Sequence, residues 1–420
     1  MDLPPIPTVR IDDLAEPTWS PAVQHLRAQM TALAPLIPWD VDGLCSVATM
    51  ETGLDTFGDN GFRDRLATVL RCWDETPLSP AGRVALWGQM LQYLKNRLLV
   101  EHELRRHPEI HDIEVRAPIV IVGLPRTGTT HLHNLIAADP GLRFLPYWES
   151  VEPVLCDAQR TGGAVDPRWE RTETALQALN ETLPYFKRMH HMTTWHAHEE
   201  INLLAIDFSS MLFETLALST SLRDWYKAHD QTAHYEYLKT VMKVLQFLRP
   251  GPVRWVLKSP QNLEQLAVLN RVFPDATVVF THRDPVSVTA SMVTMQAYLL
   301  RLSYDHVDPE GVGRYWSDRV EDLLMACLRD RDLVPPERSL DVRFDDYMAD
   351  QLAMLERIYA LADQPITEAA RRGWQTYLND HGRDRHGKVV YELAPFGIDA
   401  AERRATYGPY LERFDLRAEQ

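Results

Sequence analysis

Cysteine is scarce in this sequence, and so are segments that could anchor a chain in a membrane. The four cysteines lie far apart, at Cys45, Cys72, Cys156 and Cys327. None has the CxxC spacing that structural zinc sites and redox motifs use. The sequence has no run of about 18 uncharged apolar residues, and no basic start followed by an apolar segment. These absences predict a soluble, cytoplasmic protein with no membrane span and with ordinary buried thiols.

Positive charge is also in short supply. The 420 residues include 44 Lys and Arg against 59 Asp and Glu, which gives a formal net charge of −15. Binding to a long polyanion depends on summed positive charge, so this balance argues against nucleic acid as a partner. A few basic residues gathered in one pocket can still bind a small phosphorylated molecule. The length leaves one or two domains open, and the sequence predicts no particular oligomeric state.

Helical periodicity dominates two parts of the chain. In residues 1–112, the clearest apolar spacing of three to four is that of Trp87, Leu91, Leu94 and Leu98. In residues 151–250, one amphipathic helix is predicted by the spacing of Ile201, Leu204, Phe208 and Leu212. We therefore expect an N-terminal helical region over 1–112 and, within a domain over 113–420, a helical insertion that shapes a substrate pocket.

Apolar, β-branched segments alternate with helical material from Ile119 onwards. The first ends at Gly123, and the others cover residues 254–257, 276–280 and, more weakly, 340–344. Strands that alternate with helices imply a parallel sheet joined by crossover connections. The fold class predicted for residues 113–420 is therefore α/β, with a parallel sheet flanked by helices.

The segment after the first strand has the form of a phosphate-binding loop. It reads Leu-Pro-Arg-Thr-Gly-Thr-Thr from Leu124 to Thr130, and Gly123 and Gly128 have P-loop spacing. Small residues there let backbone N–H groups converge on an anion at a helix N-terminus. A nucleoside-triphosphatase loop needs Lys after the second Gly, but Thr129 stands there and the cation is Arg126, inside the loop. The predicted fold is thus a P-loop-like parallel sheet, whose loop departs from the nucleoside-triphosphatase pattern at the position of the lysine.

Two further strand ends carry basic residues. Lys258 ends the apolar strand that begins at Trp255, and Ser259-Pro260 follows it. Arg283 ends the next strand in Thr-His-Arg-Asp-Pro, and Ser291 comes eight residues later in the following helix. Ligands of open α/β sheets bind beyond the carboxyl ends of the strands, and the planar guanidinium group matches a phosphate. The strand ends together predict a site for an anionic ligand.

These blocks resemble those of bacterial-type sulfotransferases, which use 3′-phosphoadenylyl sulfate (PAPS). The resemblance implies in-line transfer of a sulfuryl group from PAPS to a hydroxyl of a small or lipid-like acceptor. It places the 5′-phosphosulfate on Pro125, Arg126, Thr127, Gly128, Thr129 and Thr130. The 3′-phosphate is expected on Arg283 and Ser291. By analogy with a C-terminal segment that closes over the cofactor, Arg385, Gly387 and Lys388 of the late basic block are expected near the 3′-phosphate or the adenosine, although the block could equally be a mobile charged loop.

Sulfuryl transfer needs cations at the departing phosphate and a base for the acceptor proton. The cations expected to act in catalysis are Arg126 and Lys258. For the base we favour the pair Glu199 and Glu200, with His198 behind it, although either carboxylate could instead pair with a helix dipole. The family often has a His at the position of Asn262, and an amide cannot accept that proton. Asn262 is therefore expected to orient the acceptor.

Other readings of the site remain open at this point. A P-loop-like nucleotide phosphotransferase would need Lys at position 129 and a strand ending in Asp to hold magnesium. A non-catalytic nucleotide-binding protein would fit the substituted Asn262. Several histidines lie near the acidic pair, but sulfuryl transfer needs no divalent ion, so no metal is expected.

The nature of the acceptor is suggested only by side chains of the insertion. Its apolar side chains predict an aromatic-lined pocket for a lipid-like acceptor. The alternative is that these side chains belong to the hydrophobic core. The residues are Tyr185, Phe186, Met189, Met192, Trp195, Phe208 and Phe213.

Overall fold

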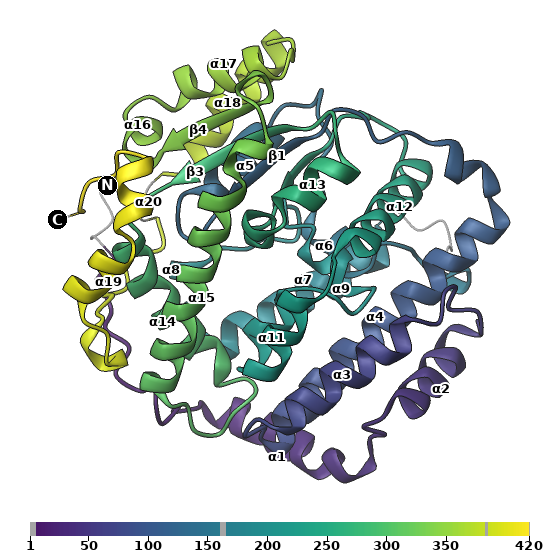
Figure 1. The fold of residues 1–420 in the computed structure, drawn as a ribbon. Coiled ribbons are helices and arrows are strands. Elements are labelled where there is room, and N and C mark those ends of the chain that lie inside the picture. Colours follow the sequence, from purple (N-terminus) through teal and green to yellow (C-terminus); the bar gives the residue numbers. More distant parts are fainter. Residues whose placement is uncertain (1–5, 160–164, 383–384, 420) are drawn as a thin grey trace, which may run out of the picture.

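The structure, a computed structural model, describes residues 6–159, 165–382 and 385–419, and a four-stranded parallel sheet lies at the centre of this part (Figure 1). The strands are β1 (Ile119–Gly123), β2 (Val256–Lys258), β3 (Thr277–His282) and β4 (Ser339–Arg343). Their order is β2-β1-β3-β4, and β1 pairs in parallel with β2 and β3, as β3 does with β4. The predicted α/β fold is confirmed, and the carboxyl ends of the strands meet at one edge.

Every residue of β1, β2 and β3 is buried, which explains why these strands are mostly apolar, whereas the edge strand β4 includes the exposed Asp341. On one face Ile121 and Val279 pack against α5 (Thr129–Ala137), α17 (Gln351–Leu361) and α18 (Glu368–Asp380). On the other face Val122 and Phe280 belong to the larger core, with α13 (Leu266–Val272), α14 (Pro285–Leu300) and α15 (Pro309–Asp330). The sheet is therefore a rigid support, and the loops at its carboxyl edge can hold functional side chains.

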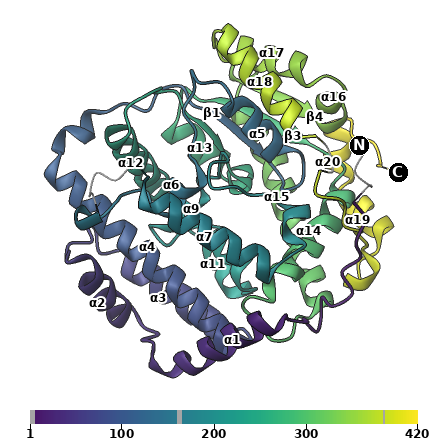
Figure 2. The same ribbon diagram turned by 180° about the vertical axis from the view of Figure 1, so that it is seen from behind.

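The N-terminal helical region lies along one side of the molecule, away from the sheet (Figures 1 and 2). It contains α1 (Pro21–Leu33), α2 (Val41–Thr52), α3 (Phe62–Asp74) and α4 (Pro80–Arg106), with short 3₁₀ turns at η1 (Ala34–Leu36) and η2 (Pro108–Asp112). Helix α4 begins at Pro80 because the Ser79 hydroxyl accepts the Gly82 N–H at 2.9 Å. The region shares one hydrophobic core with the insertion, and the boundary at residue 112 stays a prediction.

The segment between β1 and β2 is largely helical, as expected. After α6 (Tyr147–Val151) and η3 (Asp157–Gln159), it contains α7 (Pro167–Thr182), α8 (Phe186–Met189), α9 (Ile201–Ala205), α10 (Leu212–Leu216), α11 (Thr220–Ala228) and α12 (Thr232–Leu248). Helix α12 packs on α4 and α13, so the insertion connects the N-terminal region to the sheet domain.

The single amphipathic helix predicted over 201–212 is wrong. Helix α9 ends at Ala205, and Phe208 has a left-handed backbone with φ +56°. The break places Asp207 in a buried ionic cluster, in which Asp207 accepts hydrogen bonds from Arg97 at 2.7 Å and from Arg65. Burial alone would raise the pKa of Asp207, but His234, with these arginines, holds it below its usual value. The turn is thus stabilised by charged residues that are distant in sequence. The spacing of apolar residues does not reveal such contacts.

The chain after β3 returns repeatedly to the carboxyl edge of the sheet. Besides the helices already named, it contains η5 (Arg331–Leu333), η6 (Pro336–Arg338), α16 (Phe344–Ala349), η7 (Ala394–Phe396), α19 (Ala400–Thr406) and α20 (Gly408–Arg413). A further 3₁₀ turn, η4 (Pro260–Glu264), lies earlier in the chain, directly after β2. Arg404 of α19 bonds Asp284 at 2.9 Å, and Tyr410 of α20 contacts His282 at 2.6 Å. The C-terminal helices therefore pack beside the end of β3.

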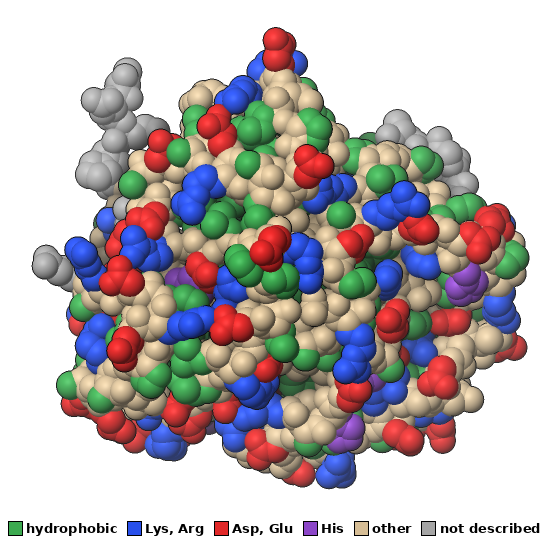
Figure 3. Space-filling model, turned by 45° about the horizontal axis from the view of Figure 1, so that its top comes forward, with side chains coloured by type: hydrophobic (Ala, Val, Ile, Leu, Met, Phe, Trp, Pro, Cys, Tyr) green, Lys and Arg blue, Asp and Glu red, His purple; other side chains and the backbone are tan. Residues whose placement is uncertain are grey.

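The surface mixes both signs of charge. On the face drawn in Figure 3, basic and acidic side chains are interspersed. Within the described ranges, no helix combines the length and the apolar character needed to cross a bilayer. The four cysteines are free, and Cys45, Cys72 and Cys327 are buried.

Candidate active site

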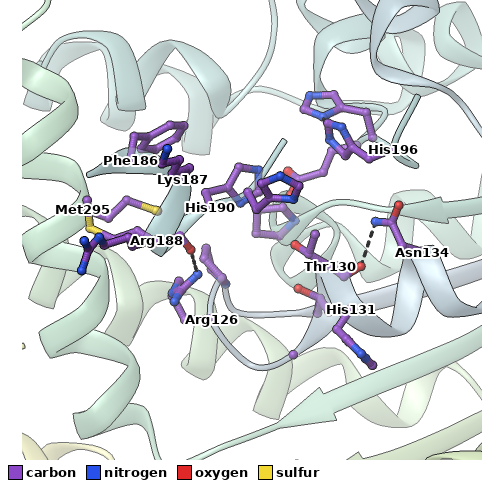
Figure 4. Close-up of a pocket in the computed structure, with 18 of the residues that line it drawn as sticks. Arg126, Thr130, His131, Asn134, Phe186, Lys187, Arg188, His190, His196 and Met295 are labelled. Atoms are coloured by element: carbon purple, nitrogen blue, oxygen red, sulfur yellow. Dashed lines mark hydrogen bonds between the residues drawn. The ribbon is translucent and has the colours of Figure 1, made fainter. Parts of the chain in front are cut away.

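A cavity of about 520 Å³ opens at the carboxyl ends of β1, β2 and β3. Its walls come from the loop after β1, from α8, α10 and α14, from residues 190–199, and from residues 381–382 and 385–387. In Figure 4, Phe186 and Met295 lie on one side, Asn134 and His196 lie on the other, and Arg126 lies between them. The cavity thus has an apolar arm and a polar arm that meet beside the loop.

The structure brings most of the predicted site residues to this cavity. Its lining includes Pro125, Arg126, Gly128, Thr129, Thr130, His198, Glu199, Arg283, Arg385 and Gly387. The predicted residues outside the lining are Thr127, Glu200, Lys258, Ser291 and Lys388.

Tight packing fixes the shape of the loop after β1. Gly128 has φ +86°, and a Cβ there would stand 3.2 Å from the Phe344 ring. The Thr127 hydroxyl turns inward and contacts the Leu124 carbonyl and the Thr281 hydroxyl, each at 2.7 Å. Thr127 therefore holds the loop closed. Helix α5 starts directly after Gly128 and has no acidic residue in its first turn. The free N–H groups of that turn give this end of the cavity a positive field.

Arg126 is a partly buried cation inside this loop. Its Nε donates to the Ser291 hydroxyl at 2.9 Å, and its Nη1 donates to the Met189 carbonyl. Both acceptors are neutral oxygens. Burial lowers the pKa of the Arg126 guanidinium, and Arg283 adds to this effect. A partly buried guanidinium whose acceptors are neutral oxygens attracts an anion.

Arg283 is the second cation, and its guanidinium group forms a bidentate ion pair with a carboxylate. Its Nε and Nη2 donate to the two oxygens of Glu419, at 2.6 and 2.7 Å, and Ser287 donates to the same group at 3.0 Å. The guanidinium also stacks on Phe344, 4.3 Å from the ring centroid. Arg283 and Phe344 line a second cavity of about 220 Å³ as well as the main one. The two cavities therefore meet at Arg283.

The expected pair of Arg283 and Ser291 is connected through a third residue. Ser291 bonds Arg126, as described above, and Arg283 Nη1 donates to the Arg126 backbone carbonyl at 2.7 Å. Helix α14 carries Ser291, which contacts Arg126, and Ser287, which contacts the Glu419 carboxylate that Arg283 binds. One helix thus aligns the two cationic groups.

Lys258 reaches the cavity from beneath its wall. Its side chain is only 3% exposed, and its Nζ donates to Glu199 and, at 3.3 Å, to the Thr130 hydroxyl. Both partners line the cavity. The ammonium group therefore lies between the loop helix and an accessible carboxylate.

Glu200 is turned away from the cavity. One carboxylate oxygen accepts a hydrogen bond from the backbone N–H of Lys258 at 2.8 Å, and the other accepts one from the Asn262 side-chain amide at 2.7 Å. Tyr235 donates to the other end of that amide at 2.6 Å. Burial raises the pKa of Glu200, and the bond from Asn262 opposes the rise. Asn262 is fully buried in this chain of contacts and is not free to orient an acceptor, so that expectation is wrong.

A group of histidines forms the polar arm of the cavity. His196 and His198 contact each other at 3.0 Å, and His198 packs on Tyr147. Burial lowers the pKa of His196 to about 4 and places that of His198 well below its usual value. These rings are therefore neutral near pH 7. In the described part of the chain, no three His, Cys, Asp or Glu side chains converge as metal ligands.

The late basic block closes one side of the cavity. Arg385 donates to His191 at 2.7 Å, and Gly387 has φ +80° with no room for a Cβ beside Arg188. Lys388 is exposed, and its carbonyl accepts the Val9 N–H at 3.0 Å. The chain near residue 9 therefore holds this block in place.

The sequence matches the sulfotransferase family over residues 118–368. The chain belongs to that family. The sulfotransferase resembles omega-hydroxy-beta-dihydromenaquinone-9 sulfotransferase Stf3 of Mycobacterium bovis and of Mycobacterium tuberculosis, with 25% identity over an alignment 280 residues long that covers 63% of this chain and 67% of the relative.

Two solved structures share the fold of this sulfotransferase. The crystal structure of sulfotransferase STF9 from Mycobacterium avium has a TM-score of 0.81 at 26% identity and covers 91% of this chain and 98% of its own. That of STF1 from Mycobacterium tuberculosis has a TM-score of 0.76 at 26% identity, with coverages of 88% and 98%.

The aromatic lining predicted for the sulfotransferase is largely wrong. Of those residues only Phe186 and Met189 line the cavity, while Phe208 and Phe213 are buried in the main core and Trp195 is exposed. The apolar arm is instead mostly aliphatic, with Ile201, Met211, Leu212, Met292, Met295 and Leu299.

Several lining residues were missed. Phe344 directly follows β4, so the rule that ligands bind beyond strand ends could have identified it. Met292, Met295 and Leu299 could have been found from helical spacing after Ser291. Glu419 carries no local signal, because its partner lies 136 residues away.

Proposed function

We propose that this sulfotransferase transfers the sulfuryl group of PAPS to a hydroxyl of a small or lipid-like acceptor by in-line displacement. The observation that carries the proposal is the joining of two cations at one end of the cavity, where Arg283 bonds the backbone of Arg126 at 2.7 Å. PAPS has anionic groups at both ends of its adenosine unit, and two linked cations suit such a ligand.

The 3′-phosphate of the donor would bind Arg283 and Ser287. The Glu419 carboxylate supports this assignment, because it accepts three hydrogen bonds from these two side chains, as a phosphate group can. The donor would have to displace Glu419 to bind. Ser291, one helical turn further, would contact the donor through Arg126 or after Arg126 has moved.

The 5′-phosphosulfate would lie against the loop after β1. Arg126 lines that part of the cavity, together with Thr129 and Thr130 of the first turn of α5. As the bond between sulfur and the bridging oxygen breaks, negative charge develops on the departing phosphate. Each preorganised donor at that position contributes on the order of 3 kcal/mol. Lys258, beside Thr130, would contact the transferring group.

Glu199 is our choice for the base. It is the one carboxylate among the described residues that line the cavity. The acceptor hydroxyl gives its proton to Glu199 while its oxygen forms the new bond to sulfur, and the electron pair of the broken bond stays on the phosphate. Lys258 would turn from Glu199 towards the departing oxygen, which would free the carboxylate. Glu200 would position Lys258 by accepting a hydrogen bond from the backbone N–H of Lys258.

The acceptor is proposed to have an aliphatic body. The apolar arm between α10 and α14 is lined by flexible methionines and leucines, which adapt to chains of varied shape. The Stf3 relative is named as a sulfotransferase of a hydroxylated menaquinone derivative, which is lipid-like. Both observations favour an alcohol on an extended apolar molecule.

The proposal is tested by calorimetric binding of 3′,5′-adenosine bisphosphate, adenosine 5′-monophosphate and ATP to the wild-type chain. We expect the bisphosphate to bind at least about tenfold more tightly than the monophosphate, because only it engages Arg283. Preference for ATP with magnesium would instead favour a P-loop-like phosphotransferase. Tight bisphosphate binding without transfer to any alcohol would favour a non-catalytic nucleotide-binding protein.

A further inference from the structure

Helix α14 runs from the arginines of the proposed donor site along the apolar arm of the cavity. Ser287 contacts Glu419, and Ser291 contacts Arg126. The residues that follow on the cavity side are Met292, Met295, Gln296 and Leu299. Gln296 lies five residues after Ser291, which is about 7.5 Å along the helix axis. Gln296 therefore belongs to the acceptor arm, beyond the loop that would hold the donor.

Gln296 is a polar side chain in an apolar wall. It is 2% exposed, and its Oε1 atom is buried without a hydrogen-bond partner in the described part of the chain. Its neighbours along the wall are Met292, Met295 and Leu299, whose side chains offer no N–H or O–H group. The nearby Thr215 hydroxyl, on α10, already donates to the Leu212 carbonyl at 2.7 Å.

An unpaired buried amide oxygen is costly, and the few such atoms in native proteins call for an explanation. The other groups on α14 that face the site are either apolar or paired. An apolar residue at position 296 would extend the methionine wall without this cost. The arrangement therefore suits a ligand that brings its own hydrogen-bond donor to Oε1.

We infer that Gln296 determines acceptor specificity by binding a second hydrogen-bond donor on the acceptor, a hydroxyl or N–H group separate from the hydroxyl that is sulfated. This inference rests on the proposed function. The acceptor class is an extended aliphatic alcohol with another polar group part-way along or at its far end. A simple alcohol of equal length would leave Oε1 unpaired and bind less tightly.

The test compares straight-chain alcohols with the diols of the same length, over about six to ten carbons to span the helical rise from Ser291 to Gln296. Binding of each is measured by calorimetry with 3′,5′-adenosine bisphosphate present, and kcat/KM is measured with PAPS. For the best length, we expect the wild-type chain to favour the diol roughly tenfold. In Gln296→Met the ratio of the two affinities should fall to near one.

Gln375→Met makes the same chemical change on the exposed face of α18 and should keep the wild-type ratio. Equal ratios in wild type and Gln296→Met, in both binding and kcat/KM, would overturn the inference. Bisphosphate affinity is the control for folding of the donor site. If the wild type fails to bind the bisphosphate, the proposed function fails, whereas bisphosphate binding without diol preference defeats the inference about Gln296 alone.

Discussion

Arg283 donates a hydrogen bond to the backbone carbonyl of Arg126 at 2.7 Å. The contact joins the end of β3 to the loop after β1, in neighbouring strands of the sheet. Arg126 has φ +71°, a conformation that a non-glycine residue adopts only where the surroundings enforce it. Arg283 therefore helps to fix the loop as well as providing a cation, and substitutions at the two residues should be coupled.

Replacement of Arg283 by Lys should reduce selectivity for the 3′-phosphorylated nucleotide. Lys keeps the charge but loses the two-pronged bond that Arg283 now makes with Glu419. We expect affinity for 3′,5′-adenosine bisphosphate to fall by about one to two orders of magnitude, with a smaller change for adenosine 5′-monophosphate. Calorimetry on both nucleotides measures this. Arg372→Lys, on the exposed face of α18, is the control, and unchanged selectivity in Arg283→Lys would refute the assignment.

Glu419→Gln should tighten binding of the bisphosphate. The carboxylate competes with the 3′-phosphate for Arg283 and Ser287, so only molecules in which Glu419 has moved away can bind the donor. A neutral amide pairs less strongly with a guanidinium. We expect a gain of up to about tenfold in affinity.

The matched control for this prediction is Glu412→Gln, which changes the same charge at an exposed position of α20. Adenosine 5′-monophosphate should bind both variants like the wild type. Weaker bisphosphate binding in Glu419→Gln would show that Glu419 assists the donor rather than competing with it.

Glu199→Gln and Glu200→Gln should affect different quantities. Loss of the base at Glu199 should lower kcat by about two to four orders of magnitude, with little change in bisphosphate affinity. Glu200 accepts the Lys258 N–H and the Asn262 amide inside the protein, so Glu200→Gln should mainly lower the free energy of unfolding, by about 1 to 3 kcal/mol. Near wild-type kcat in Glu199→Gln would move the base to His198 or elsewhere.

Acid should destabilise the protein through buried histidines. Burial, with a contribution from Lys258, lowers the pKa of His133 to about 3 from 6.5. Between these values the unfolded chain binds a proton that the folded chain does not, so stability falls as pH drops below 6.5. From pH 7 to pH 5 this one group should remove about 2 kcal/mol. Urea unfolding should therefore show a smaller loss over this range for His133→Gln than for the wild type, and equal losses would contradict the shift.

Local patterns were enough to predict the part of the site that lies at the strand ends. The loop from Pro125 to Thr130, Lys258 and Arg283 follow apolar strands, and a parallel sheet necessarily brings such strand ends to one edge. The same reasoning predicted the α/β fold. These features depend on residues close in sequence, which is why sequence reasoning was sufficient.

Other features depend on contacts between distant segments. Glu200 and Glu199 are adjacent, yet only Glu199 faces the cavity, because Asn262 and the Lys258 backbone hold Glu200 inside the protein. The helix ends before Phe208, where Asp207 accepts hydrogen bonds from arginines of the N-terminal helices. Whether an aromatic side chain lines a cavity or fills the core also depends on packing, which a helical pattern does not specify.

The most direct measurement is transfer of labelled sulfate from PAPS to an aliphatic alcohol in a single turnover, with wild type and Arg126→Ala compared. We expect labelled product with the wild type. In Arg126→Ala transfer should fall by at least about two orders of magnitude, while bisphosphate binding weakens less, because Arg126 acts on the departing phosphate. Unchanged transfer in Arg126→Ala, or bisphosphate binding without any transfer in the wild type, would contradict the proposed reaction.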